Sequence, residues 1–464
     1  MSADFPQSWL RVLLNDVGEI VTGKTPSTKN PDNFGGNIPF IKPADLDNGG
    51  YVTRTADTLT DAGAKLVPTI PPNSIPVTCI GNLGKVGITN QTSATNQQIN
   101  TVVPSSQVDY RFFYYQLQTL KPWMQENASA TTVTIINKGK FSKAPVTLPP
   151  LAEQKVIADK LDTLLAQVET TKTRLERIPQ ILKRFRQSVL AAAVSGRLTE
   201  EWRERNSHQF PYENRELSEI IHEMRNGLSP KPNEDGRGHP ILRISSVRPF
   251  SLDQIDIRHL EVSETDKERY SLQPDDLLFT RYNGSIEFVG VCARVSQLNH
   301  DTLLYPDKLI RVRVDKAQVT PQFLEIFAAS FEAREYIYSL VKSTSGQKGI
   351  SGKDLKLMKV ALPTVSEQTE IVRRVDQLFA HADRIEQQVN NALTRVNNLT
   401  QSILAKAFRG ELTEQWRKDN PELISGDNSA EALLGRIKAE RAAQQPKKKT
   451  RNKKPKSGKQ TIKD

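Results

Sequence analysis

The sequence has little cysteine and no long apolar run. Its two cysteines, Cys79 and Cys292, lie far apart without a C-x-x-C partner, which excludes a disulfide framework and a thiolate metal site. No stretch approaches membrane-spanning length, and the N-terminus lacks the basic start and cleavage site of a signal peptide. Six scattered histidines offer no metal-ligand spacing. We therefore expect a soluble cytoplasmic protein without a metal site or a membrane contact.

The charge is concentrated at one end of the chain. The 464 residues carry a formal charge of +11, but nine of the basic residues and a single acid lie between Pro446 and Asp464. Such a segment is typical of a disordered, solvated tail that adds non-specific affinity for nucleic acid. The length predicts two to four domains. The net charge therefore describes the tail, and a nucleic-acid function needs other evidence from the folded part.

The chain contains a long internal repeat. The stretch LPPLAEQKVIADKLDTLLAQVETTK begins at Leu148, and LPTVSEQTEIVRRVDQLFAHADRIE begins at Leu362, an offset of 214 residues. The same offset, without a gap, pairs RLTEEWRERN with ELTEQWRKDN. Composition alone does not produce such a match, so two equivalent units are expected.

Each repeat contains a long helix with an apolar seam. Apolar residues advance alternately by four and three positions, the a/d pattern of a coiled coil. Gly196 and Gly410 are expected to stop the helices, and Pro179, which has no counterpart, is expected to kink or interrupt the first. A helix buried on its own domain is the simpler alternative, but two equal faces favour pairing of the copies. The seam residues are Ile157, Leu161, Leu164, Val168, Leu175, Ile371, Val375, Leu378, Ile385, Val389, Val396 and Leu399.

The stretch GEIVTGKT, residues 18–25, matches the phosphate-binding pattern G-x-x-x-x-G-K-[ST]. A phosphate loop needs a helix that continues from the Lys-Thr pair, whereas PSTKNPDNFGG follows here and cannot sustain one. The second copy has Gly227-Leu228-Ser229 at this place, without lysine. Glu153-Gln154-Lys155 has the E-x-K pattern of a nuclease but opens the long helix. We therefore expect no nucleotide site and no catalysis by the chain alone.

The segments that precede the two helices also correspond, although more loosely. GKTP aligns with GLSP, NIPFIKPADL with GHPILRISSV, and TIINKGKFSKAPVTLP with KGISGKDLKLMKVALP. Short alternating strands, Gly/Asn turns and a helix near 110–127 and near 320–342 predict compact α+β domains. The expected order is a globular domain (1–150), a long helix (151–206), a second globular domain (207–361), a second long helix (362–420), and a C-terminal helix with the basic tail (421–464).

This duplicated arrangement resembles the specificity (S) subunit of type I restriction-modification systems, particularly the enteric IA group. The motifs that carry the resemblance are LPPLAEQKVIADKLDTLLAQV, RFRQSVLAAAVSGRLTEEWR, AFRGELTEQWR and, in the second domain, DDLLFTRYNGSIEFVGV and TSGQKGISGKDLK. The first domain matches only in outline. The resemblance implies two target recognition domains that each read one half of a bipartite double-stranded DNA site. It also implies that the two helices form an antiparallel coiled coil as the spacer, with a seam of about 48 Å.

The same resemblance implies partners and cofactors outside this chain. Two modification (M) subunits would methylate adenine with S-adenosylmethionine, and two restriction (R) subunits would translocate with ATP and magnesium and cleave. The chain itself would be non-catalytic and hold no cofactor. A coiled-coil scaffold whose globular domains bind protein is the alternative, and salt-sensitive binding to one bipartite duplex would distinguish the two.

The candidate DNA-binding residues are basic and amide side chains at turns that recur in both copies. Bases are read by Arg, Lys, Asn and Gln, and phosphates are held by Lys and Arg. Any single one of them is equally consistent with a solvated surface group. The candidates are Lys42, Asn82, Lys85, Asn96, Gln97, Gln98, Lys138 and Lys140 in the first domain and Arg243, Arg281, Tyr282, Asn283, Lys308, Gln347, Lys348 and Lys353 in the second.

Overall fold

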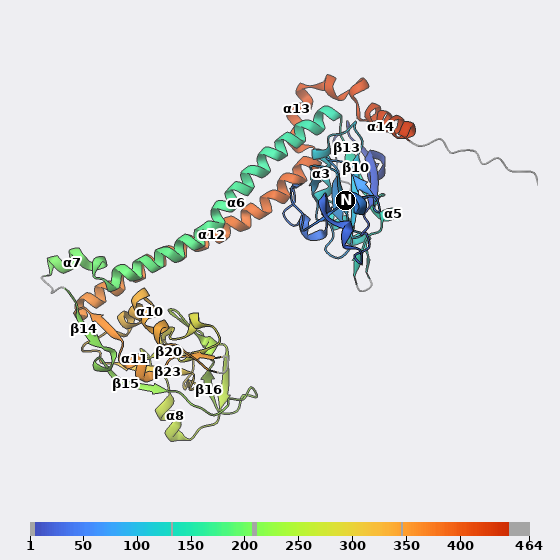
Figure 1. Ribbon diagram of the computed structural model, residues 1–464. Helices are drawn as coiled ribbons and strands as arrows, with labels where there is room; N and C mark the ends of the chain where they lie inside the picture. The colour runs from blue at the N-terminus through green and yellow to red at the C-terminus, as the bar shows by residue number, and fades with distance from the viewer. Residues whose placement is uncertain (1–4, 131–132, 207–210, 345–346, 445–464) are drawn as a thin grey trace, which may run out of the picture. The chain divides into compact units, whose positions relative to one another are not determined.

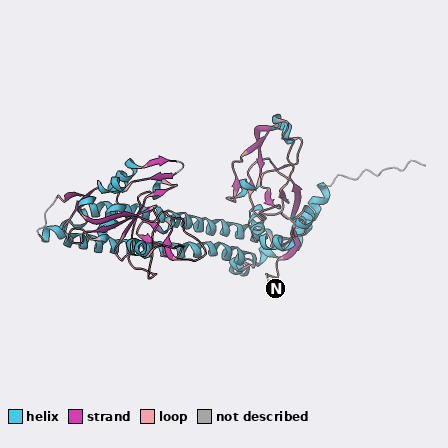
Figure 2. Cartoon of the chain, turned by 90° about the horizontal axis from the view of Figure 1, so that it is seen from below, coloured by secondary structure: helices cyan, strands magenta, loops and turns pink. Residues whose placement is uncertain are grey.

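The computed structural model describes residues 5–130, 133–206, 211–344 and 347–444. The chain divides into two compact units, one formed by Met1–Thr173 with Leu393–Asp464 and the other by Arg174–Ala392. Each unit contains one globular domain of small sheets and short helices, together with parts of two long helices (Figure 1; Figure 2). The expected α+β class is confirmed.

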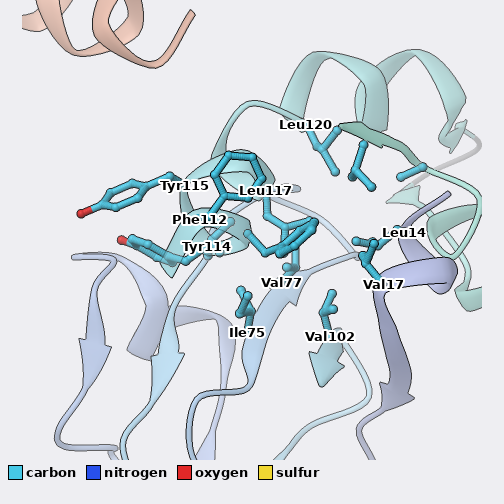
Figure 3. Close-up of a cluster of buried hydrophobic side chains, with 14 of the residues drawn as sticks. Leu14, Val17, Ile75, Val77, Val102, Phe112, Tyr114, Tyr115, Leu117 and Leu120 are labelled. Atoms are coloured by element: carbon cyan, nitrogen blue, oxygen red, sulfur yellow. The ribbon is translucent and has the colours of Figure 1, made fainter. Parts of the chain in front are cut away.

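The first domain is held together by a helix that packs on a three-stranded sheet in the order β2-β10-β7. Figure 3 shows Phe112 and Leu117 of α3 directed toward Ile75 and Val77 of β7 and Val102 of β10. Asp109 begins this helix by accepting hydrogen bonds from two backbone N–H groups. The strands are β1 (Leu10–Leu13), β2 (Gly18–Thr22), β3 (Phe34–Ile41), β4 (Tyr51–Val52), β5 (Asp57–Leu59), β6 (Thr69–Ile70), β7 (Ile75–Thr78), β8 (Ile88–Thr89), β9 (Ser93–Thr95), β10 (Ile99–Pro104), β11 (Ser129–Ala130), β12 (Thr134–Ile135) and β13 (Pro145–Leu148), and the helices are α1 (Leu14–Val17), α2 (Asp61–Ala64), α3 (Tyr110–Gln118), α4 (Lys121–Asn127) and α5 (Lys138–Phe141).

The second domain is built on a four-stranded antiparallel sheet in the order β15-β23-β20-β22. Phe279 of β20, Ile310 of β23 and Phe323 of α9 are fully buried in one cluster. The strands are β14 (Glu213–Glu216), β15 (Ile221–Asn226), β16 (His239–Leu242), β17 (Val247–Arg248), β18 (Ser251–Leu252), β19 (Ile257–Leu260), β20 (Leu277–Thr280), β21 (Tyr282–Asn283), β22 (Cys292–Arg294), β23 (Leu309–Val314), β24 (Lys342–Thr344), β25 (Gln347–Gly349) and β26 (Lys359–Leu362), and the helices are α7 (Glu200–Arg205), α8 (Glu264–Tyr270), α9 (Pro321–Ala329), α10 (Phe331–Leu340) and α11 (Gly352–Lys356).

The two long helices, α6 (Leu151–Val194) and α12 (Val365–Phe408), are 44 residues each. Within the first unit, the amine of Lys160 donates to the carbonyl of Leu412, just past the end of α12, at 2.7 Å. Within the second unit, Arg186 near the end of α6 pairs with Asp383 of α12 at 2.6 Å. A residue near the start of α6 therefore contacts the chain just past the end of α12, and a residue near the end of α6 contacts an earlier part of α12. This order confirms the expected antiparallel pairing.

The seam positions differ in burial along the helices. The side chains of Ile157, Leu161, Ile371, Val375 and Val389 are buried. Those of Leu164, Val168, Leu175, Leu378, Ile385 and Val396 are half-buried, and Leu399 is exposed. Four of the five buried positions, all except Val389, also belong to the buried cluster of a globular domain.

Both expected helix stops are present. Gly196 and Gly410 follow α6 and α12 at φ of 79° and 77°, a left-handed conformation that glycine adopts without a steric penalty. An interruption at Pro179 was wrong, because α6 continues through it. Proline removes one backbone N–H donor, and the surrounding turns keep their hydrogen bonds.

The helices expected near 110–127 and 320–342 are each broken into two. In the first domain α3 ends at Gln118 and α4 starts at Lys121. In the second domain Ser330 separates α9 from α10 and accepts a hydrogen bond from the N–H of Ala333. A serine cap stabilises a new helix start more than it stabilises a helix interior, so the second break is a local effect of that side chain.

Each long helix has a buried glutamate in its first turn that contacts the other repeat. Glu153 accepts hydrogen bonds from Trp9 at 2.8 Å, Thr413 at 2.6 Å and Arg417 at 2.5 Å. The carboxylate is fully buried, so the arginine compensates its charge. The E-x-K resemblance to a nuclease therefore has a structural explanation.

The second copy repeats this arrangement 214 residues further on. Glu367 accepts from Thr199 at 2.8 Å, Arg203 at 2.8 Å and Tyr212 at 2.7 Å. The neighbouring glutamines also match, since Gln154 accepts from the N–H of Asp109 and Gln368 from the N–H of Thr320. The two Glu-Gln pairs thus join each helix start to the globular domain before it and to the segment after the other helix.

The segment after α12 first repeats the segment after α6, and only its later part, with α14, has no counterpart in the first copy. It contains α13 (Glu414–Asp419) and α14 (Ala430–Gln444). Leu433 and Ile437 of α14 are fully buried in the core of the first domain. Glu440 accepts hydrogen bonds from Ser105 and Ser106, and Arg441 donates to the carbonyl of Asn15. The first unit is therefore completed by the C-terminal helix.

Candidate nucleic-acid interface

In both domains a glycine directly follows the second strand. The loops that meet beside this glycine are equivalent in the two domains and form what we call the corner of each domain. The N–H of Gly23 donates to the carbonyl of Ile99 at 3.1 Å, and that of Gly227 donates to Leu309 at 3.2 Å. A Cβ atom at either glycine would lie 2.1 Å or 2.2 Å from a backbone oxygen of the neighbouring chain segment. Glycine is required by this close approach. After Thr25 the chain continues as a loop, as expected for a chance match to the phosphate pattern.

A cation stands at the start of an equivalent 3-10 helix in both domains. Lys42 precedes the helix Pro43–Leu46, and Arg243 precedes the helix Ile244–Ser246. Lys42 pairs with Asp57, and Arg243 pairs with Asp256 at 2.7 Å. Each cation is thus held in place by an acid and remains partly accessible to solvent.

The second domain has a groove of about 610 Å³ beside Gly227. Leu228 and Pro306 form part of its wall. The cations that line it are Lys231, Arg243, Arg258 and Lys308. The sequence predicted Arg243 and Lys308 and missed Lys231 and Arg258. Lys231 directly follows the aligned GLSP segment, whereas Arg258 reaches the groove only because β19 pairs with β16.

Arg281 lies next to this groove. Its N–H donates to the carbonyl of Lys308 at 2.8 Å, and its guanidinium stacks over the ring of Tyr282, with 4.7 Å between the guanidinium carbon and the ring centroid. The Nε atom of Arg281 is buried without a hydrogen-bond partner among the described residues, and so is that of Arg258. Nη1 of Arg281 donates to the carbonyl of Asp307 at 3.4 Å, and Nη2 of Arg258 pairs with Glu234 at 2.9 Å, so both guanidinium groups are held beside the groove.

The equivalent corner of the first domain carries amides. The N–H of Cys79 donates to the carbonyl of Gln98 at 2.8 Å, the same contact that Arg281 makes with Lys308. Gln98 is therefore the structural counterpart of Lys308, and Cys79 that of Arg281. Burial raises the pKa of the Cys79 thiol to about 11, so it is uncharged at neutral pH.

The other amide side chains of this corner take part in hydrogen bonds with neighbouring side chains. Gln97 is exposed and accepts a hydrogen bond from Thr25 at 2.6 Å. Asn96 is 7% exposed and donates to Gln98 at 3.0 Å. Asn96 therefore positions Gln98, and the GKT segment contributes Thr25 to the corner, which the sequence did not predict.

A hairpin follows the corner in both domains. In the second domain β25 pairs with β21 and β24, so Lys348 lies opposite Asn283. In the first, β11 pairs with β12, and Ile135 forms a bridge with Ile80. Gln347 is exposed. The structure thus brings Tyr282, Asn283, Gln347 and Lys348 together on one small sheet.

The remaining candidates lie outside these corners. Lys138 and Lys140 are exposed on α5, and Lys353 is exposed on α11. Lys85 pairs with Asp47, and Asn82 is exposed on the turn after β7. No group of side chains in the described part of the chain has a metal-binding arrangement, and no described helix is long and apolar enough to cross a membrane.

Comparisons with known proteins agree with this geometry. The family model described as type I restriction modification DNA specificity domain matches residues 6–180 and 211–395, one match per copy. The specificity subunit of the type I restriction enzyme EcoBI of Escherichia coli is 38% identical over 463 residues, covering 96% of this chain and 95% of the relative. That of EcoKI from Escherichia coli K12 is 61% identical over 326 residues, 70% of each chain.

Solved structures show the same fold. A chain from a study of complex assembly and conformational transition of the type I R-M system matches with a TM-score of 0.67 and 16% identity, covering 88% of this chain and 99% of the other. The HsdS subunit from Thermoanaerobacter tengcongensis matches with a TM-score of 0.57 and 16% identity, covering 88% and 98%.

Proposed function

Because the chain belongs to the family of type I restriction-modification DNA specificity subunits, we propose that it reads a bipartite DNA target, one half-site per globular domain. The observation that carries this proposal is the repeated corner. Each domain has a closely packed glycine and a cation that is paired with an acid. The third member is Gln98 in the first domain and its counterpart Lys308 in the second. The groove of the second domain is lined by four cations, as a nucleic-acid backbone requires.

The proposal assigns a role to each part of the chain. Residues 1–150 and 207–361 are the target recognition domains, and 151–206 and 362–420 are the spacer helices. Residues 421–464 carry the C-terminal helix and the basic tail. The antiparallel spacer sets the distance between the half-sites, so the bases between them are read only as a length.

The candidate residues divide into two roles. Arg281, Lys308 and Gln347 are the base-reading groups of the second domain, since Arg, Lys and Gln match base edges. Gln97 and Gln98 take this role in the first domain. Asn96, Tyr282 and Asn283 shape the corners. Phosphate contacts are the role of the remaining candidates, namely Lys42, Asn82, Lys85, Lys138, Lys140, Arg243, Lys348 and Lys353.

The specificity subunit is not catalytic by itself, so the chemistry comes from partners. We propose that two M subunits methylate adenine with S-adenosylmethionine and that two R subunits use ATP and magnesium to translocate and cleave DNA. The two buried free cysteines are compatible with the reducing cytoplasm in which such a complex would act.

Selection from a randomised pool of duplexes tests the proposal. The full chain, co-expressed with the M subunit of its host, is incubated with the pool, and the retained duplexes are sequenced. We expect two short motifs separated by a gap of fixed length. Binding should also weaken steeply with salt. A pool that yields no motif, together with salt-insensitive binding, would show that the chain is an assembly scaffold instead.

A further inference from the structure

The second domain contacts α12 with its main buried cluster and, separately, with the turn between β17 and β18. The first contact lies at the start of the helix, where Gln368 accepts from the N–H of Thr320 at 2.7 Å and donates to the carbonyl of Gln318 at 2.9 Å. Ile371 and Val375 follow in the buried cluster of the domain. This attachment fixes where the domain sits on the helix. Ala193 and Val194 of α6 belong to the same cluster, so both long helices contact the domain there.

The second attachment is an aromatic contact. Phe250 of the domain meets Phe379 of α12 edge to face, with ring centroids 5.4 Å apart and planes at 90°. Both rings line a cavity of about 710 Å³ that separates the domain from the two helices. Leu190 of α6 and Arg334 of α10 line the same cavity. The open space beside the contact leaves the turn that carries Phe250 in contact with α12 through this ring pair.

The backbone at Phe250 is strained. Phe250 has a φ of +58°, a left-handed conformation that a bulky residue rarely adopts. It stands in the turn between β17 and β18. In the first domain, the turn after the equivalent 3-10 helix has Gly49 and Gly50 at φ of +62° and +65°. Glycine would relieve the backbone strain in the second domain too. The aromatic ring of Phe250 is therefore present despite a cost in backbone strain energy.

The part of α12 that contacts the Phe250 ring is held to α6 by ion pairs. Arg186 of α6 pairs with Asp383 at 2.6 Å and with Glu386 at 2.8 Å, one turn and two turns beyond Phe379. The first domain is attached differently. There, Arg111 pairs with Asp159 and Asp162 of α6, each at 2.8 Å. The first domain is thus attached to its long helix by ion pairs, whereas the second domain makes the apolar contact between Phe250 and Phe379.

We propose that Phe250 is a positioning residue for target reading: through Phe379 it fixes the orientation of the second domain on α12 and so restricts the gap between the two half-sites to one length. The inference rests on the proposed function. One base pair adds about 3.4 Å of duplex length. Removal of either ring lets this edge of the domain tilt toward or away from α12, and we expect that tilt to admit a gap changed by one base pair.

The test is the duplex selection described above, carried out with the full chain and the M subunit. For Phe250→Gly, which suits the left-handed turn, we expect both half-site motifs unchanged and the gap split between the wild-type length and lengths one base pair longer or shorter. Phe379→Ala removes the other ring without touching the turn and should split the gap in the same way. Phe250→Tyr keeps the ring and should keep one length.

Phe331→Ala is the matched control, because Phe331 is a phenylalanine of the same domain that is 69% exposed. It should select the wild-type gap. A single wild-type gap in both Phe250→Gly and Phe379→Ala would overturn the inference, and so would loss of the second motif alone. Failure of the wild-type chain to yield any motif would instead refute the proposed function.

Discussion

The guanidinium of Arg417 lies 2.5 Å from the carboxylate of Glu153, although 264 residues separate them in the chain. Arg203 stands in the same relation to Glu367, at 2.8 Å. Each contact joins the start of one long helix to the segment that follows the other. The antiparallel helix pair is therefore closed at both ends by a buried ion pair, one in each unit.

Glu153→Ala should destabilise the first unit strongly. The substitution leaves Arg417 without its counter-charge in a site where the carboxylate was fully buried, and breaking such a pair costs about 3 to 5 kcal/mol. Urea unfolding followed by circular dichroism should show a lower midpoint. Glu414→Ala, which breaks an exposed pair with Lys418, is the control and should leave the midpoint in place. Equal midpoints for Glu153→Ala and the wild type would contradict the buried role.

Gly23→Ala should disturb the first recognition corner. The new Cβ atom would lie 2.1 Å from the carbonyl oxygen of Asn96, so the loop has to move away from Gln97 and Gln98. Duplex selection should then lose the first half-site motif and keep the second. Gly139→Ala is a suitable control, because its Cβ atom would meet nothing closer than 3.4 Å. Retention of both motifs by Gly23→Ala would show that the corner does not read DNA.

Arg281→Ala should weaken DNA binding by about 1 to 3 kcal/mol if its guanidinium pairs with a guanine. The loss should be confined to duplexes that carry the intact second half-site. A gel-shift titration measures it, with Arg237→Ala as the control, since Arg237 is an exposed arginine paired with Asp235. Unchanged affinity and unchanged site preference would dismiss the role of Arg281.

Deletion of residues 446–464 should lower the salt dependence of binding. The segment carries nine basic residues, and each phosphate contact that it makes releases counterions. Affinity measured over a range of salt concentrations should fall less steeply in the truncated chain, while the selected motifs stay the same. Loss of either motif would mean that the tail takes part in specific reading.

The sequence predicted the helix pair well because its signals are local. A heptad stripe and a terminal glycine are visible within the segment that folds, and the gapless repeat showed that two equal faces were available to pair. The break at Ser330 was missed because the expected helix was inferred from composition over 320–342, whereas one serine side chain decides it. The interruption that was one of the two expected effects of Pro179 does not occur, because the turns around it remain helical.

The sequence predicted the recognition corners only in part. Arg243 and Lys308 were identified from turns that recur, but Arg258 needs the pairing of β16 with β19 to reach them. Thr25 was set aside with the phosphate pattern, although its hydroxyl bonds Gln97. The partners of Glu153 could not be inferred, since Trp9 and Arg417 come from opposite ends of the chain.

The packing of α14 into the first domain has a consequence for synthesis on the ribosome. The unit of Arg174–Ala392 is one continuous stretch and can complete its core as soon as it emerges. The other unit starts before this stretch, yet it lacks Leu433 and Ile437 until the whole of the second unit has been made. Part of its apolar core therefore remains exposed on the nascent chain until α14 has been made. A product truncated before α14 would keep that apolar surface exposed and would be prone to aggregate.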